Sequence, residues 1–119
     1  MEFREPSFTT QEKAEAYESV CDLFEHLFAE LKALGSKKPS ETLSASKVTF
    51  INRLLKDILD IMESEPEHKY LDLLDDETLP QYSDAILILS QYEAALKGFK
   101  GRHFGYQSNL GEQAWYIEP

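Results

Sequence analysis

Carboxylates spaced three residues apart are the side chains of this chain that are best suited to chemistry. They form three groups, which are Glu12, Glu15 and Glu18, then Asp57, Asp60 and Glu63, then Asp72 and Asp75. Magnesium prefers several oxygen ligands, and paired carboxylates on neighbouring helices supply them. If these groups met in space, they would bind Mg²⁺ and support hydrolysis of a nucleotide or another phosphoester.

The apolar residues of the same segments determine where those carboxylates point. Apolar residues at steps of three and four form one stripe on each of three predicted helices. With Tyr17 in the first stripe, Glu15 and Glu18 fall on the far side of that helix. Asp60 also points away from the second stripe, and Asp57 lies at its flank. We therefore predict no metal or cofactor within one chain. The alternative is a Mg²⁺ site that a second subunit completes across a dimer, and four such acids around one cavity would favour it.

The excess of acidic over basic side chains is the second informative feature. The formal net charge is −10, and between residues 57 and 77 nine carboxylates face a single lysine, Lys69. Such a field repels nucleic acids and anionic membranes and attracts a basic protein. The predicted partner-binding surface includes four acids of this segment, namely Asp72, Asp75, Asp76 and Glu77.

The last nineteen residues lose the helical period but remain rich in aromatic side chains. Trp115 and Tyr116 are the main examples, and residues 115–117 also have the character of a short strand. Large apolar side chains seldom stay in water, so this tail either covers the bundle or binds a partner. Both readings stay open, and Trp115 and Tyr116 complete the predicted partner-binding set.

Other catalytic patterns are weak. The single cysteine, Cys21, lies inside an apolar stripe, where we expect a small buried side chain. Glu65 and His68 form a Glu-x-x-His pair with no second copy, whereas a two-metal helical site needs two. Arg102 and His103 are adjacent at a predicted helix C-terminus, where the helix dipole disfavours anions. These residues favour a non-catalytic protein.

The apolar stripes, and the glycine- and proline-containing segments between them, predict one all-α domain over residues 1–119. We expect an irregular bundle of three long helices and one short helix, with an aromatic, non-helical C-terminal tail packed on it. Thr9 and Thr78 are predicted to cap helices, and Gly35 and Gly101 to end them. The expected segments are an arm over 1–8, a helix over 9–34, a loop over 35–42, a helix over 43–63, a short helix over 66–74, a helix over 79–100 and a tail over 101–119.

These features together predict a class of function. The sequence has no apolar run long enough to span a bilayer and no signal-like N-terminus, so we expect a cytoplasmic protein. We predict a small acidic protein-binding module that docks or neutralises a basic protein partner, without nucleic acid or membrane binding. A homodimer is a further hypothesis. The alternative is the Mg²⁺-dependent hydrolase described above, built from Glu15, Glu18, Asp57 and Asp60.

Overall fold

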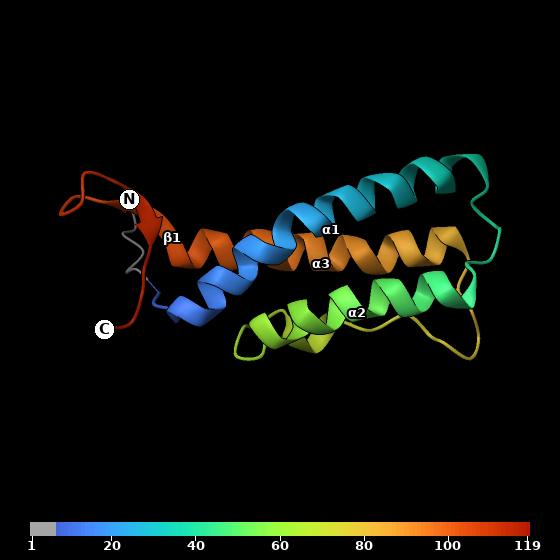
Figure 1. Ribbon diagram of the computed structural model, residues 1–119, viewed down its shortest axis with the longest axis horizontal. Helices are drawn as coiled ribbons and strands as arrows, with labels where there is room; N and C mark the ends of the chain where they lie inside the picture. Colours follow the sequence, from blue (N-terminus) through green and yellow to red (C-terminus); the bar gives the residue numbers. More distant parts are fainter. Residues whose placement is uncertain (1–6) are drawn as a thin grey trace.

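The computed structural model describes residues 7–119 as an elongated bundle of three long helices with a C-terminal hairpin (Figure 1). The bundle measures 51 × 24 × 23 Å. The predicted all-α fold is confirmed, including the aromatic tail packed on the helices. The elements are α1 (Gln11–Lys37), α2 (Ala45–Ile61), the 3₁₀ turn η1 (His68–Tyr70), α3 (Tyr82–His103), β1 (Phe104–Gln107) and β2 (Glu112–Trp115).

The start of α1 is fixed by Thr10 and not by Thr9. The Thr10 side chain accepts a hydrogen bond from the Lys13 amide, which satisfies one free amide of the first turn. Thr9 instead pairs with the C-terminal tail, because its backbone exchanges hydrogen bonds with Tyr116 and Glu118 beside Ile117. The predicted N-cap was therefore one residue early. Of the predicted arm over 1–8, residues 1–6 lie outside the described part of the chain.

The prediction that α1 ends at Gly35 was wrong, because α1 continues to Lys37. Gly35 is buried within the helix, and its Cα faces the side chains of Ile86 and Tyr82 on α3. A side chain at this position would collide with Ile86. Glycine is thus needed here for the close approach of two helices and not for a helix end.

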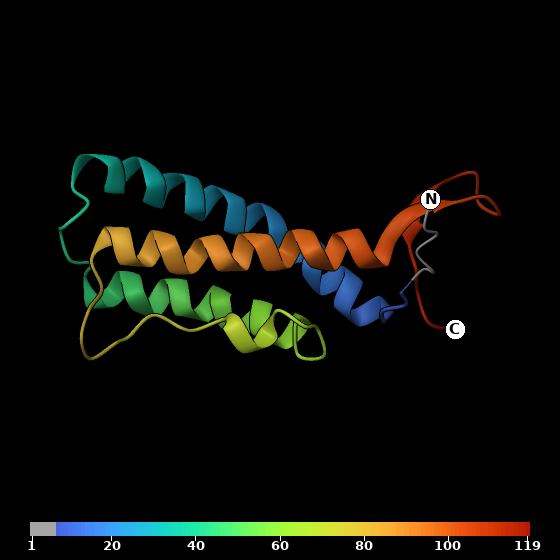
Figure 2. The same ribbon diagram turned by 180° about the vertical axis from the view of Figure 1, so that it is seen from behind.

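The predicted short helix over 66–74 is present only as the three-residue turn η1, and the chain then runs extended beside α2 (Figure 2). The Asn52 side chain on α2 binds both backbone groups of Leu74, at 2.8 Å to the carbonyl and 2.9 Å to the amide. The Tyr92 hydroxyl donates to the Asp72 carbonyl at 2.8 Å. These side chains replace the backbone hydrogen bonds that a helix would have made.

The last helix begins and ends about three residues later than predicted. Its N-cap is Gln81, because Thr78 is used in a turn that the Asp75 carboxylate closes. At the other end α3 passes through Gly101 and reaches His103. The chain then forms an antiparallel hairpin, with Phe104 opposite Trp115 and Gln107 opposite Glu112.

The core lies where the three stripes meet. Leu55 and Ile58 of α2 pack with Phe24 of α1 and with Leu89 and Tyr92 of α3, and all five are at most 1% exposed. At the hairpin end, an aromatic cluster joins the tail to the bundle. Its members are Tyr17, Phe99, His103, Phe104 and Trp115.

Cys21 is half-buried and not fully buried, with its Sγ 3.8 Å from the Tyr17 hydroxyl. None of the helices within residues 7–119 is long and apolar enough to cross a membrane.

Candidate functional site

A groove runs along the surface between the antiparallel helices α1 and α2, and we call it the α1–α2 groove. Three hollows follow one another along it, of about 260, 330 and 570 Å³. The first two share Leu27, Glu30 and Phe50, and the last two share Asp57. The hollows therefore form one continuous feature that extends over most of the length of α1.

The first two hollows form an apolar stretch, where α1 ends and α2 begins. Large apolar side chains line it while remaining in contact with water: Leu23 is 63% exposed, Phe50 60% and Leu34 47%. A row of such side chains in one groove is typical of a protein-binding surface. The charged or titratable residues that line this stretch are His26, Glu30, Lys47, Arg53 and Asp57.

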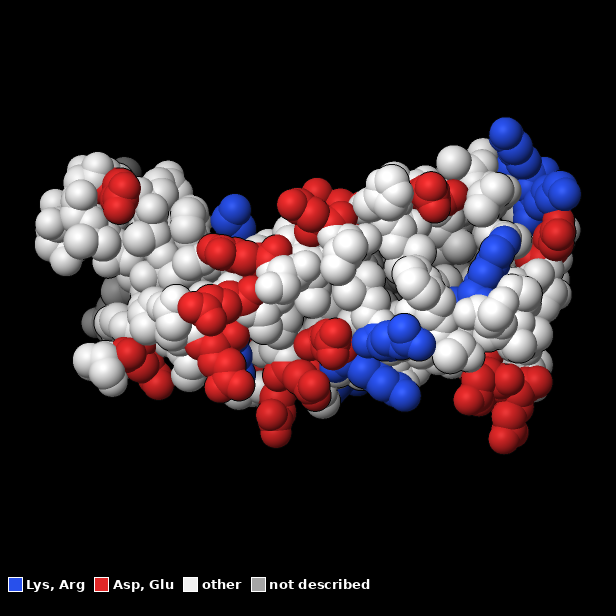
Figure 3. Space-filling view, in the orientation of Figure 1, with Lys and Arg blue, Asp and Glu red and all other residues white. Residues whose placement is uncertain are grey.

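The third hollow forms the acidic end of the groove, where α1 begins and α2 ends. Its walls carry Glu12 from α1, Asp57 and Asp60 from α2, and Glu63 from the turn that follows α2. Figure 3 shows that acidic side chains gather over this half of the face. Lys13 also lines the hollow, and its amine donates to the Ser64 hydroxyl at 3.0 Å. Four carboxylates, from α1, α2 and the turn after α2, thus surround one hollow.

The spacing of these acids differs from that of a preformed metal centre. Within residues 7–119, no three histidine, cysteine or acidic side chains lie close enough together to hold one ion. The other two carboxylates of the alternative metal site, Glu15 and Glu18, do not line the groove. Glu15 accepts a hydrogen bond from Gln11 at 2.9 Å, and Glu18 accepts one from the Trp115 indole at 2.8 Å.

The acidic run of the sequence is divided in space into two parts. Residues 71–80 carry the chain back along α2, from Leu74 beside Asn52 to Gln81 beside Thr42 (Figure 1). Asp75, Asp76 and Glu77 therefore lie toward the opposite end of α2 from Glu63. The Asp75 carboxylate accepts hydrogen bonds from the backbone amides of Thr78 and Glu77, and these bonds lower its pKa. The acids of this loop therefore do not add to the acidic end of the groove.

The two aromatic residues of the predicted partner-binding set lie in the hairpin and its exit, far from that loop (Figure 1). Trp115 is half-buried and packs edge-on against Tyr17, with 5.1 Å between the ring centroids. Tyr116 is half-buried as well, with its hydroxyl against Gly105. Both side chains are engaged in packing within the chain, so they form no joint surface with Asp72, Asp75, Asp76 and Glu77.

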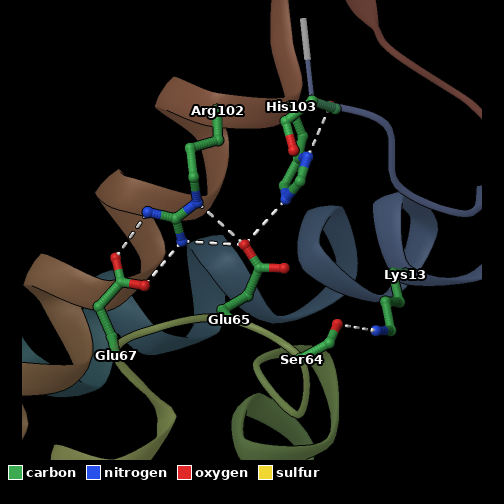
Figure 4. Close-up of polar contacts among 7 residues, drawn as sticks. Lys13, Ser64, Glu65, Glu67, Arg102 and His103 are labelled. Atoms are coloured by element: carbon green, nitrogen blue, oxygen red, sulfur yellow. Dashed lines mark hydrogen bonds and ion pairs between the residues drawn. The ribbon is translucent and has the colours of Figure 1, made fainter.

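A second polar cluster was not foreseen from the sequence (Figure 4). The Arg102 guanidinium donates two bonds to the Glu67 carboxylate, at 2.7 and 3.0 Å, and its Nε donates to Glu65 at 3.0 Å. The His103 ring nitrogens lie 2.8 Å from Glu65 Oε1 and 2.7 Å from the Ser7 carbonyl oxygen. The residues of this cluster come from α3, the turn after α2 and the segment just before α1.

Arg102 and the two carboxylates of this cluster stabilise one another's charged forms. Partial burial alone would raise the pKa of Glu67, but the hydrogen bonds and charge of Arg102 outweigh it and lower that pKa below its ordinary value. Burial acts against the Arg102 charge as well, and the bonds to Glu67 and Glu65 outweigh it and raise its pKa. The N–H groups of the Arg102 guanidinium donate to carboxylates within the protein. The cluster therefore holds three segments of the chain together, and these donors are not available to a ligand.

Comparisons with known proteins leave the site to be judged on its geometry. No protein-family model matches the chain, and searches of curated proteins and of solved structures found no match. What the coordinates define is a three-helix bundle with a C-terminal two-stranded hairpin and an aromatic cluster.

Proposed function

We propose that this protein is a non-catalytic protein-binding module whose α1–α2 groove docks a basic segment of a protein partner. The observation that carries the proposal is the continuity of the groove. It joins a stretch of exposed apolar side chains to a hollow lined by four carboxylates.

The two parts of the groove contribute to the free energy of binding in different ways. Burying Phe50, Leu23 and Leu34 under a partner removes apolar surface from water, which drives association. The acidic end steers a cationic partner toward the groove and fixes its orientation. Residues 10 to 34 of α1 span roughly 36 Å at 1.5 Å per residue, which matches an amphipathic helix of six or seven turns.

A basic amphipathic peptide tests this proposal directly. We expect a labelled helical peptide of leucine and lysine to bind the protein in fluorescence anisotropy at about 0.15 M salt, where the Debye length is about 8 Å. The triple variant D57N/D60N/E63Q removes three carboxylates from the groove and should weaken binding by at least about tenfold, because three ionic contacts are lost.

The chain offers a control variant with the same change of charge. D75N/D76N/E77Q also removes two aspartates and one glutamate, but from the loop at the other end of α2. It should change the affinity by less than about twofold, since exposed charges beyond a Debye length are screened. Equal losses in the two triple variants would mean that the peptide senses only net charge, and the groove would be rejected.

The Mg²⁺-dependent hydrolase is the second candidate, because four carboxylates from α1, α2 and the turn after α2 do surround one hollow. Thermal unfolding with Mg²⁺ or Mn²⁺ plus a nucleotide separates the two functions. A ligand that binds only the folded state raises the melting temperature. Our proposal predicts no rise beyond that seen with D57N/D60N/E63Q. A rise that this variant abolishes and the loop variant keeps would favour the hydrolase.

A further inference from the structure

We infer that His103 is the sensor of a pH-dependent clasp. While both of its ring nitrogens carry a proton, it holds the segment before α1 on the end of α3, and it releases that segment when one proton is lost. The clasp lies at the hairpin end of the bundle (Figure 4). It uses none of the residues that line the α1–α2 groove, so it does not depend on the proposed function.

The two ring nitrogens of His103 each face a hydrogen-bond acceptor. Nδ1 lies 2.7 Å from the Ser7 carbonyl oxygen, and Nε2 lies 2.8 Å from Glu65 Oε1. A carbonyl and an ionised carboxylate only accept hydrogen bonds, and a neutral imidazole has a single N–H to donate. The neutral ring can therefore make only one of these two bonds, whereas the imidazolium makes both. The geometry needs one proton more than a neutral ring and an ionised carboxylate supply.

Arg102 places that additional proton on the ring and not on Glu65. Its Nε donates to the same carboxylate oxygen at 3.0 Å, and its Nη2 lies 2.9 Å from that oxygen. Contact with a guanidinium favours the ionised form of a carboxylate. Although burial acts to raise it, the pKa of Glu67 is lowered by the hydrogen bonds of Arg102 and also by the charge of His103.

The charge count of the cluster also favours the imidazolium. The side chains of His103 and Glu65 are only 4% and 9% exposed, so water stabilises either charge weakly. With the ring protonated, two cations, His103 and Arg102, face two carboxylates, Glu65 and Glu67. With the ring neutral, one negative charge has no counterpart, which is costly in a buried site.

The other elements around the ring contribute aromatic and backbone groups. On α1, Tyr17 stacks on Phe99, whose ring meets the imidazole at 4.7 Å. Lys13, also on α1, donates to the Ser64 hydroxyl at 3.0 Å beside the turn after α2. The strand exit supplies the Tyr116 amide, which donates to the backbone carbonyl of the histidine at 2.7 Å. Within residues 7–119, Glu65 is the one carboxylate in an ion pair with the ring.

Loss of a proton at higher pH breaks the bond to Ser7. The remaining proton stays on Nε2, because a carboxylate is a stronger acceptor than a neutral carbonyl. Nδ1 then presents a lone pair to the Ser7 carbonyl oxygen, and two acceptors at 2.7 Å repel each other. The Ser7 amide keeps a long bond of 3.4 Å to the Arg102 carbonyl, whereas Thr9 has bonds of 2.8 and 2.9 Å to Tyr116 and Glu118. Ser7 should therefore move away while Thr9 stays in place.

NMR of the histidine rings and backbone amides tests the clasp. At neutral pH we expect protons on both ring nitrogens of His103. As the pH rises, the ring should lose one proton, and the Ser7 amide signal should shift with the same midpoint, while the Thr9 signal shifts much less. E65Q keeps the size of the side chain but removes its charge, and should lower both midpoints by about one pH unit or more. H103Q should abolish the Ser7 transition.

The exposed pair of His26 and Glu30 supplies a matched control. His26 Nε2 lies 3.7 Å from Glu30 Oε1, and its side chain is 80% exposed. H26Q should leave the Ser7 transition unchanged. A His103 ring with a single N–H at neutral pH would overturn the inference, as would midpoints that E65Q does not lower or a Ser7 transition that persists in H103Q. Circular dichroism checks that the variants stay helical, and if H103Q does not fold, the unchanged protein and E65Q still decide.

Discussion

Replacing Phe99 by alanine is expected to lower the free energy of unfolding by about 4 kcal/mol, the range for truncating a buried phenylalanine. Phe99 has no exposed surface. It stacks on Tyr17 with 5.5 Å between ring centroids and meets the His103 ring at 4.7 Å. It also contacts Trp115 at 5.8 Å, so its removal leaves a cavity between α1, α3 and the hairpin.

Urea denaturation at one fixed protein concentration measures this loss, because the concentration dependence of any dimer then cancels. Tyr106→Ala provides the control, since Tyr106 is an aromatic residue of the adjacent strand that is 62% exposed. Its loss should stay within about 0.5 kcal/mol. If Phe99→Ala cost no more than Tyr106→Ala, the aromatic cluster would contribute nothing to stability.

The sequence predicted the three long helices because their stripes depend only on local periodicity. Their ends were less predictable, since tertiary contacts decide them. Gly35 resembles a helix stop until Ile86 of α3 is seen against it. Gly101 looks equally like a stop, yet α3 continues for two more residues, and His103 ends it inside the aromatic cluster.

The segment over 66–74 shows the same limit more strongly. Its serine, proline and glutamate spacing is a sound local signal for a helix start. The signal is outweighed by Asn52, which holds both backbone groups of Leu74 in the extended form. No local pattern marks a polar residue on one helix as the hydrogen-bonding partner of a segment twenty-two residues away.

The sequence did not predict the candidate groove, but it did mark two of the acids that line it. The sequence identified Asp57 and Asp60 as a spaced pair, and both line the acidic end. The apolar periodicity placed both acids outside the buried stripe of their helix. A surface groove between two helices is lined by residues in such positions. The periodicity missed the separation of Asp75, Asp76 and Glu77 from those acids, because that depends on the extended return of residues 71–80.

The cluster around Arg102 was unpredictable for a further reason. Its ion pairs join residues thirty-five to thirty-eight positions apart, and each member has an ordinary local explanation. From the sequence alone, Arg102 is interpreted as a cation that complements the negative end of a helix dipole. Only the folded chain shows that Glu65 receives Arg102 and His103 together, which makes Glu65 the residue whose loss should matter most in this cluster.

Replacing Glu65 by alanine is expected to cost about 3 kcal/mol of unfolding free energy. The Glu65 side chain is only 9% exposed, and its Oε1 accepts from Arg102 Nε at 3.0 Å and lies 2.8 Å from His103 Nε2. Truncation leaves the His103 ring buried without that partner and Arg102 with half of its carboxylates. Urea denaturation measures the loss, and Glu67→Ala is the control, with a side chain that is 26% exposed.

Glu67→Ala should cost about 1 kcal/mol, because solvent screens its more exposed pair with Arg102. A second test uses the double variant Glu65→Ala/Arg102→Met. If the Glu65 effect arises from an uncompensated Arg102 charge, removing that charge as well recovers part of the loss, and the two costs are not additive. Strict additivity would instead show that Glu65 acts through packing or His103 alone, and the view that these residues stabilise the fold as one ion-pair network would have to be abandoned.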